Sequence, residues 1–163
     1  MMLRKALIAL TVACVASFVV PATTAHAGIK ARKNHLVARA KNQLGTDYRY
    51  GGETPRRGFD CSGFTLWTFE KVTQLPHSSI QQYKLGRRTG YKRIEKKARL
   101  HRGDLVFFKT TSAKIGHAGM YIGRGRFIHS SSGAGKVTIS SVRDKYYYGP
   151  RFRGGVRIPQ LRR

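Results

Sequence analysis

Cys61 lies at the centre of the segment Gly58-Phe-Asp-Cys-Ser-Gly-Phe64, directly before an apolar run that continues to Val72. The run is apolar on all sides, which is typical of a buried helix rather than a surface one. In the first turn of such a helix, a cysteine meets free backbone N–H groups and the positive end of the helix dipole. The segment therefore predicts a nucleophilic cysteine with a lowered pKa. The competing interpretation is a small buried hydrophobe.

Asp60 and Ser62 flank this cysteine. Asp60 is suited to cap the expected helix, because its carboxylate can accept a hydrogen bond from the free amide of Ser62 or Gly63. Ser62 and Gly63 are small, so a substrate could approach the sulfur.

His117 and His129 are the histidines that fall on two expected neighbouring strands, joined through Gly123-Arg124-Gly125. If these three residues form the loop with Gly125 left-handed, His129 lies opposite Gly119, on the same face as His117. A two-residue loop would instead put the histidines on opposite faces. The sequence thus permits, but does not require, a histidine pair on one face.

An imidazole beside a thiol can take its proton and later protonate a leaving amine, while another polar group fixes the tautomer of that imidazole. Two alternatives stay open: ordinary strand histidines with satisfied hydrogen bonds, or a partial zinc site that lacks an evident fourth ligand. The remaining histidines of the expected domain, His35, His77 and His101, are interpreted as surface or locally hydrogen-bonded residues. We expect no metal and no other cofactor.

The N-terminus has the layout of a secretory signal peptide. Arg4 and Lys5 precede the apolar run Ala6–Val20, and Ala25-His26-Ala27 resembles a cleavage site. We therefore expect residues 1–27 to be a signal peptide, and the mature protein to be exported to the periplasm, the cell wall or the medium. Lipidation at Cys14 is the weaker alternative, because the sequence stays apolar after it.

Removal of the signal peptide would leave Cys61 as the single cysteine of the mature chain. Exported proteins usually carry paired cysteines or none, so an unpaired one indicates a free thiol with a use. The whole chain carries a net charge of +25; without Arg4 and Lys5, 30 basic residues face 7 acidic ones, which gives +23. Such a field attracts polyanions.

For an exported protein, the polyanions would be anionic wall polymers, lipopolysaccharide or anionic lipid. No nucleic-acid-binding motif is visible, so no nucleic-acid partner is expected. Our hypothesis is that the charge acts as a diffuse wall anchor, whose affinity should fall as salt rises.

The elements expected to position these residues are helices followed by strands. A helix is expected from Asn34 to Leu44 with Gly45 as its stop, and a short one over Ile80–Tyr83 capped by Ser78 or Ser79. Lys84–Arg102 is expected to be a basic loop. Further strands are expected at Leu105–Phe108, Val137–Ser140 and Phe152–Ile158. This order predicts a single α+β domain with an antiparallel sheet over residues 28–163.

Six ordered segments resemble the NlpC-type peptidoglycan endopeptidases and together extend over about residues 34 to 158. The Asp-Cys-Ser-Gly element alone is moderately specific, but it is strong when the two histidine strands follow it in this order. The matching segments are Gly45-Thr-Asp-Tyr-Arg-Tyr-Gly-Gly52, Gly58-Phe-Asp-Cys-Ser-Gly-Phe64, Leu75-Pro-His-Ser-Ser79 with Gln82, Gly103-Asp-Leu-Val-Phe-Phe108, His117-Ala-Gly-Met-Tyr-Ile-Gly123 and Arg126-Phe-Ile-His129.

The resemblance implies a papain-like α+β fold that cleaves peptidoglycan stem peptides, typically between γ-D-glutamate and diaminopimelate or lysine. It implies that Cys61 is the nucleophile, His117 the general base and then acid, and His129 the orienting third member. It also implies that Tyr48 binds substrate and helps to stabilise the oxyanion, with the backbone N–H of Cys61 as the other donor.

By the same resemblance, Asp60 and Ser62 grip the amino end of the substrate, with structural capping as the alternative. Asp104 matches a family aspartate and is interpreted as a turn residue. His77 departs from the family, which commonly has arginine there, and so does Gly154-Gly155 before Val156-Arg157.

The leading hypothesis is an exported, monomeric cysteine endopeptidase that cleaves peptidoglycan stems through a thioester acyl-enzyme. One alternative is a papain-like amidase or acyltransferase on another substrate. The other is a non-catalytic cationic protein that binds the cell wall.

Overall fold

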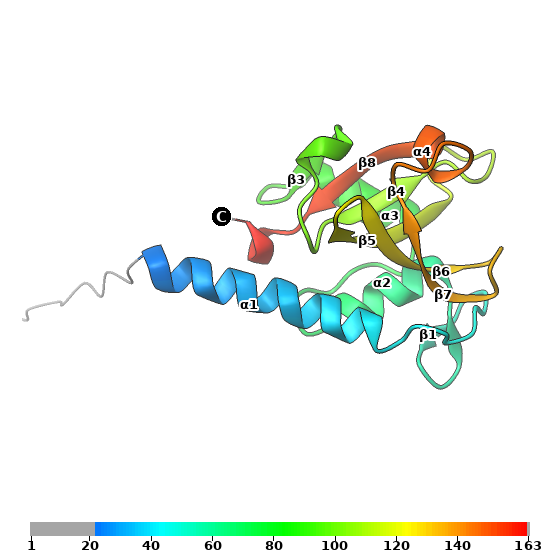
Figure 1. The fold of residues 1–163 in the computed structure, drawn as a ribbon, viewed down its shortest axis with the longest axis horizontal. Helices are drawn as coiled ribbons and strands as arrows, with labels where there is room; N and C mark the ends of the chain where they lie inside the picture. Colours follow the sequence, from blue (N-terminus) through cyan, green and yellow to red (C-terminus); the bar gives the residue numbers. More distant parts are fainter. Residues whose placement is uncertain (1–21, 163) are drawn as a thin grey trace, which may run out of the picture.

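The computed structural model describes residues 22–162, and these form an α+β fold in which helices pack on an antiparallel sheet (Figure 1). The main sheet has six strands in the order β3-β8-β4-β5-β6-β7, and every neighbouring pair is antiparallel. The expected strands are confirmed, with small differences at their ends: β4 is Leu105–Phe108, β5 is His117–Gly123, β6 is Arg126–Ser131, β7 is Lys136–Ser141 and β8 is Phe152–Arg157.

The expected loop over Lys84–Arg102 is wrong, because this segment contains the edge strand β3, Lys92–Ile94. Ile94 is buried and pairs with Gly155 of β8. The strand therefore forms through contacts with a distant segment, which the many charged residues around it do not reveal in the sequence. Two short 3₁₀ helices lie on either side of the strand: η1 is Leu85–Arg87 and η2 is Lys97–Arg99.

The first helix, α1, spans Ala22–Lys41 and so begins well before the expected Asn34. The added residues are rich in alanine and contain no proline, which suits a helix. The buried side chains Leu36, Val37 and Ala40 join the core, while most of the preceding turns are exposed and extend away from the body of the protein (Figure 1). After Lys41 a turn ends at Gly45, whose φ of +87° suits glycine.

Residues 1–21, including Cys14, lie outside the described part of the chain. The last residues of the expected signal peptide, 22–27, belong to α1, which therefore crosses the expected cleavage site. Among residues 22–162, no helix has both the length and the apolar character that crossing a membrane requires. The signal peptide and export stay predictions.

The central helix is α2, Cys61–Phe69, which packs between the sheet and α1. Phe64 and Phe69 are fully buried, in agreement with the expected buried helix, although α2 ends before Val72. Arg39 of α1 donates two hydrogen bonds to the carbonyl of Trp67 near the end of α2. These bonds satisfy a carbonyl at the helix end, where intrahelical donors run out.

Two short elements frame α2. A two-stranded hairpin precedes it, with β1 at Glu53–Thr54 and β2 at Gly58–Phe59. After it comes α3, Ser79–Lys84, capped as predicted by Ser78, whose hydroxyl accepts a hydrogen bond from the Gln81 amide. A last helical turn, α4 at Tyr148–Arg151, precedes β8, and η3 at Pro159–Leu161 follows it.

The β5–β6 turn differs from the expected three-residue loop. Arg124 and Gly125 both have positive φ, and they form a two-residue turn in which Gly123 pairs with Arg126. Ile122 is an extra residue on β5, so Tyr121 pairs with Phe127 beyond it. This bulge restores the register that the three-residue loop would have produced, and His117 and His129 therefore share one face.

Asp104 is more than the expected turn residue. Its carboxylate is fully buried and forms two hydrogen bonds with the Arg157 guanidinium, at 2.7 and 2.8 Å. It also accepts the backbone N–H of His101. The pair ties the start of β4 to the end of β8.

We predict that Arg157→Met lowers the free energy of unfolding by about 3–5 kcal/mol, because it leaves the Asp104 carboxylate buried without its counter-charge. Adding Asp104→Asn should recover part of this loss, since the amide oxygen can still accept the His101 N–H and no charge is buried. Urea unfolding followed by circular dichroism measures both variants. A double variant as unstable as Arg157→Met alone would contradict this account.

Candidate active site

Cys61 is the first residue of α2, as the sequence predicts, and its position is fixed by the cap before it. The Asp60 carboxylate accepts the Gly63 amide at 2.7 Å and the Ser62 hydroxyl at 2.9 Å. Gly63 has to be glycine, because a Cβ there would lie 2.1 Å from the carbonyl oxygen of Gly52. The cap and this close approach together orient the thiol toward β5.

The predicted lowering of the Cys61 pKa is wrong. Burial raises the pKa of the thiol to about 11, and the negative Asp60 adds to the rise. Hydrogen bonds from the backbone N–H groups of Ala118, Ser62 and Cys61 itself oppose this shift, but they are smaller than the cost of desolvating a thiolate. The start of the helix does favour negative charge, yet the low polarity around the sulfur dominates.

His117 and His129 are hydrogen-bonded to each other, with Nε2 of His117 2.8 Å from Nδ1 of His129. Their rings meet edge to face, with centroids 4.9 Å apart. On its other side, Nε2 of His129 lies 3.0 Å from the hydroxyl of Ser140 on β7. The predicted histidine pair is thus present, and Ser140 extends it into a chain of three polar groups.

The chain is consistent with a protonation pattern that leaves His117 able to act as a base. His117 donates its Nε2–H to His129, and His129 donates its Nε2–H to Ser140. Nδ1 of His117 then carries no proton and can accept one from a thiol. This is the tautomer that a general base requires, and the two hydrogen bonds of the chain hold the ring of His117 in place.

Both imidazoles are neutral at ordinary pH. Burial lowers the pKa of His117 to about 4, and burial together with the neighbouring His117 holds the pKa of His129 well below its usual value. With a protonated thiol at Cys61, the resting state is a neutral pair rather than a thiolate and an imidazolium.

Aromatic side chains enclose the two imidazoles, and the sequence analysis missed them. The ring of Phe127 stacks on His129 with centroids 4.6 Å apart, and Tyr148 meets His129 edge to face at 5.2 Å. Tyr148 also lies 6.0 Å from His117, and it packs edge to face on Phe127. The Tyr146-Tyr147-Tyr148 run was the available signal, but nothing in its spacing points to β5 and β6.

Gly119 lies between the two histidine strands. A Cβ at this position would lie 2.8 Å from the ring of Phe127 and 3.0 Å from Cβ of His129. The space beside Gly119 is therefore filled by these two side chains. Glycine allows the imidazoles and Phe127 to pack tightly.

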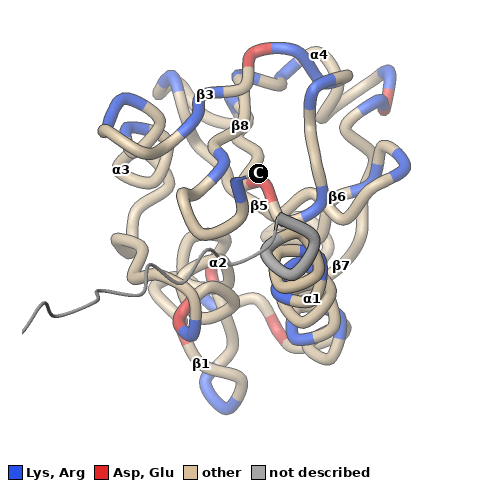
Figure 2. Tube along the Cα trace, turned by 90° about the vertical axis from the view of Figure 1, so that its left-hand side faces the viewer, with Lys and Arg blue, Asp and Glu red and all other residues tan. Residues whose placement is uncertain are grey.

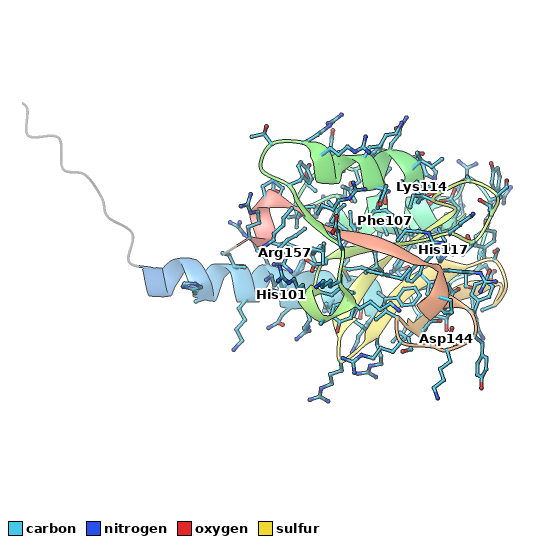
Figure 3. All side chains as sticks on the ribbon, turned by 90° about the horizontal axis from the view of Figure 1, so that it is seen from above. His101, Phe107, Lys114, His117, Asp144 and Arg157 are labelled. Carbon is cyan, nitrogen blue, oxygen red and sulfur yellow. The ribbon has the colours of Figure 1, made fainter. Side chains whose placement is uncertain are left out.

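A cleft of about 550 Å³ opens above this constellation, and both Cys61 and His117 line it. His129 is fully buried behind His117 and has no contact with solvent. Figure 3 shows His117 at the end of the sheet that also carries Asp144 and α4. The cleft also includes every other predicted site residue, namely Tyr48, Asp60 and Ser62.

Asp60 and Ser62 are used within the protein. Besides the cap, the second carboxylate oxygen of Asp60 accepts the Gly51 amide and lies 3.0 Å from Nε2 of His77. A carboxylate offers about four acceptor positions, and all four are occupied here. The capping role of Asp60 is therefore established, and a bound amine would have to displace one of these partners.

His77 is hydrogen-bonded to Asp60, in agreement with its interpretation as a surface or locally hydrogen-bonded residue, and it also lines the cleft, which was not expected. Its two ring nitrogens lie 3.0 Å from Asp60 and 3.2 Å from Glu53. The signal was its departure from the family pattern. Residues 22–162 contain no group of three or more His, Cys, Asp or Glu side chains placed to hold a metal ion.

Comparison with known proteins places these features in one family. The NlpC/P60 family model matches residues 45–156. The chain is 46% identical over 106 residues to "Probable endopeptidase NlpC homolog" of Haemophilus influenzae, covering 64% of this chain and 51% of that protein. It is 37% identical over 146 residues to "Gamma-DL-glutamyl hydrolase" of Bacillus subtilis, covering 86% and 34%.

A third relative is "Murein DD-endopeptidase MepH" of Escherichia coli, which is 35% identical over 123 residues, covering 72% of this chain and 44% of that protein. The chain thus spans about half or less of these relatives. Among solved structures, the peptidoglycan hydrolase RipB of Mycobacterium tuberculosis superposes with a TM-score of 0.65 at 27% identity, covering 86% and 73%. The papain-like α+β fold is confirmed.

A neutral thiol should react slowly with alkylating agents at neutral pH. In a Cys14→Ser variant, which leaves one cysteine, we predict that the iodoacetamide rate constant rises about tenfold per pH unit between about pH 7 and 10. The urea-unfolded chain, whose thiol has its ordinary pKa of about 9, should level off earlier. Mass spectrometry of the alkylated protein gives both rates. A plateau below about pH 8 in the folded protein would indicate a thiolate and contradict the neutral pair.

Burial of neutral histidines also predicts acid sensitivity. The unfolded chain binds protons at the ordinary histidine pKa of 6.5, whereas folded His117 binds one only near 4, so stability is lost as pH falls through this range. The loss should be about 3 kcal/mol larger in the wild type than in a His117→Gln variant. Urea unfolding at several pH values tests this; equal losses would rule out the buried neutral His117.

Proposed function

The chain belongs to the NlpC/P60 family, and from this premise we propose that it is an exported cysteine endopeptidase that hydrolyses peptidoglycan stem peptides. The observation that carries the proposal is that Cys61 and His117 line the same cleft, with His117 hydrogen-bonded at 2.8 Å to the buried His129 behind it. A protein that only bound the wall would have no use for a buried pair of hydrogen-bonded imidazoles that shares a cleft with a thiol.

In the proposed reaction, the sulfur of Cys61 attacks the carbonyl carbon of the scissile amide while its proton moves to Nδ1 of His117. The resulting oxyanion is stabilised by the backbone N–H of Cys61 and by the hydroxyl of Tyr48. Burial raises the pKa of Tyr48, as do the nearby Cys61 and Asp60, so this hydroxyl keeps the proton that it would donate.

Collapse of this intermediate breaks the C–N bond, and His117 returns the proton to the leaving amine, which leaves a thioester on Cys61. Water then attacks the thioester carbonyl, His117 takes one of its protons, and the thiol is regenerated as the acid product leaves. In this proposal, His129 and Ser140 keep the ring of His117 oriented and stabilise the imidazolium that forms when it holds the proton.

The bond that we propose is the one between γ-D-glutamate and diaminopimelate or lysine. Similarity to a protein named gamma-DL-glutamyl hydrolase supports it, while another relative is named as a murein DD-endopeptidase. Tyr48, Asp60 and Ser62 are the proposed substrate-binding residues. In this chain His77 occupies one position of Asp60, so the amino end of the stem would meet His77 as well.

The purified protein should release fragments from peptidoglycan that end after D-glutamate, as identified by mass spectrometry. Cys61→Ala should release none but should still bind sacculi, because the substitution removes only the nucleophile.

Ser140→Ala should lower kcat and leave KM near the wild-type value, since Ser140 does not line the cleft.

Sacculi that are bound but stay uncut across several wall chemistries would overturn the proposed hydrolase. That outcome would favour a papain-like amidase or acyltransferase on another substrate, or a cationic wall-binding protein. Fragments cut at a D-alanyl bond instead would leave the hydrolase intact and change only the proposed bond.

A further inference from the structure

A second cleft, of about 580 Å³, lies at the β3 edge of the sheet. Figure 3 shows His101 and Arg157, which line it, at the end of the sheet near α1, with His117 of the candidate active site toward the opposite end. The two clefts share no lining residue. We call it the basic cleft, and its lining residues are Lys92, Arg93, Ile94, Glu95, Lys96, Ala98, Arg99, His101 and Arg157.

The floor of the basic cleft contains a buried ion pair whose two charges offset each other. Arg157 and Asp104 form their buried ion pair there, and Nη2 of Arg157 also donates to the carbonyl of Arg99 at 3.1 Å. The Asp104 carboxylate is occupied by Arg157 and by the His101 amide. Its negative charge is therefore compensated within the floor and does not neutralise the cations above it.

The rim is different, because its cations lack counter-charges. Lys92, Lys96 and Arg99 are exposed, and none of them forms an ion pair with a described carboxylate. Arg93 is held in place, with its guanidinium 4.2 Å above the ring of Tyr83. Glu95 is the only acidic residue among those that line the cleft, so the rim carries excess positive charge.

Protection of an exposed sheet edge is the simpler explanation for charged residues on β3, since lysine on an edge strand discourages pairing with other chains. It accounts for Lys92 and Arg93. It does not account for Lys96 and Arg99, which lie beyond the strand at η2. The neighbouring Lys97 turns away and donates to the Gly149 carbonyl at 2.7 Å. Lys96 and Arg99 therefore line the cleft without belonging to the edge strand.

The residue types indicate the chemistry of a ligand. Guanidinium groups match the geometry of phosphate oxygens, and lysine contributes point charges around them. Several separated cations suit a chain with repeated charges better than a single anion. The lining includes no Phe, Tyr or Trp on which nucleobases could stack, so a single-stranded nucleic acid is a poorer fit than a polymer without bases.

We propose that the basic cleft binds a flexible anionic polymer whose charges are phosphate groups. This site is separate from the candidate active site and does not depend on cleavage of any substrate. It also replaces the diffuse anchor of the sequence analysis by a defined set of side chains. Figure 2 shows why this distinction needs a matched test, since Lys and Arg outnumber Asp and Glu over most segments in that view.

The test compares two triple variants of the full chain that lose the same charge. The site variant is Lys92→Gln, Lys96→Gln, Arg99→Gln, and the control is Lys41→Gln, Lys71→Gln, Arg126→Gln. The control residues are also exposed, have the same types, and lie on α1, after α2 and on β6. Binding of fluorescently labelled inorganic polyphosphate is measured by anisotropy over a range of salt concentrations, and thermal melting checks that both variants are folded.

We expect the site variant to lose about tenfold or more in affinity near physiological salt, and its plot of log affinity against log salt to become shallower by about 2. The control should lose about twofold or less, because its three residues do not line the basic cleft and exposed charges act on a distant ligand only through screened solvent. Equal losses in the two variants would overturn the site and leave a diffuse field. Binding of oligothymidylate as tight as that of polyphosphate would overturn the assigned ligand class.

Discussion

The register between β5 and β6 is the constraint on which the candidate active site depends. Side chains alternate between the two faces of a sheet, so a shift of one residue would separate His117 from His129. The two-residue turn alone would shift the pairing by one residue. The bulge at Ile122 adds one unpaired residue to β5 and so restores the register in which both histidines face the same side. With the register set, the 2.8 Å bond between the imidazoles and the Ser140 contact on β7 follow from the sheet itself.

Burial, rather than the helix dipole, decides the protonation state of this site. Phe127 and Tyr148 pack around the imidazoles, and burial also raises the pKa of the thiol, although Cys61 lines the cleft. Charge separation is therefore costly before a substrate arrives. The structure instead provides backbone N–H groups at Cys61 and Ala118, which can stabilise negative charge when it develops on the sulfur or the substrate.

Much of this could be predicted from sequence because it is encoded locally. The cap at Asp60, the helix start at Cys61, the strand periodicity and Ser78 before α3 all depend on neighbours within a few residues. The rest depends on contacts between distant segments. β3 is formed by its pairing with β8, Tyr148 reaches the histidines from a loop after β7, and desolvation of Cys61 arises from the packed sheet. No local pattern carries that information.

The protonated state of Cys61 has a consequence for the lifetime of the protein. Peroxides and disulfides react with thiolates far faster than with thiols, and the first oxidation product can proceed to irreversible acids. A thiol whose pKa is raised to about 11 exposes almost no thiolate to such oxidants. A thiol in this state is less exposed to oxidation than an ordinary free cysteine, so an unpaired cysteine can persist longer here.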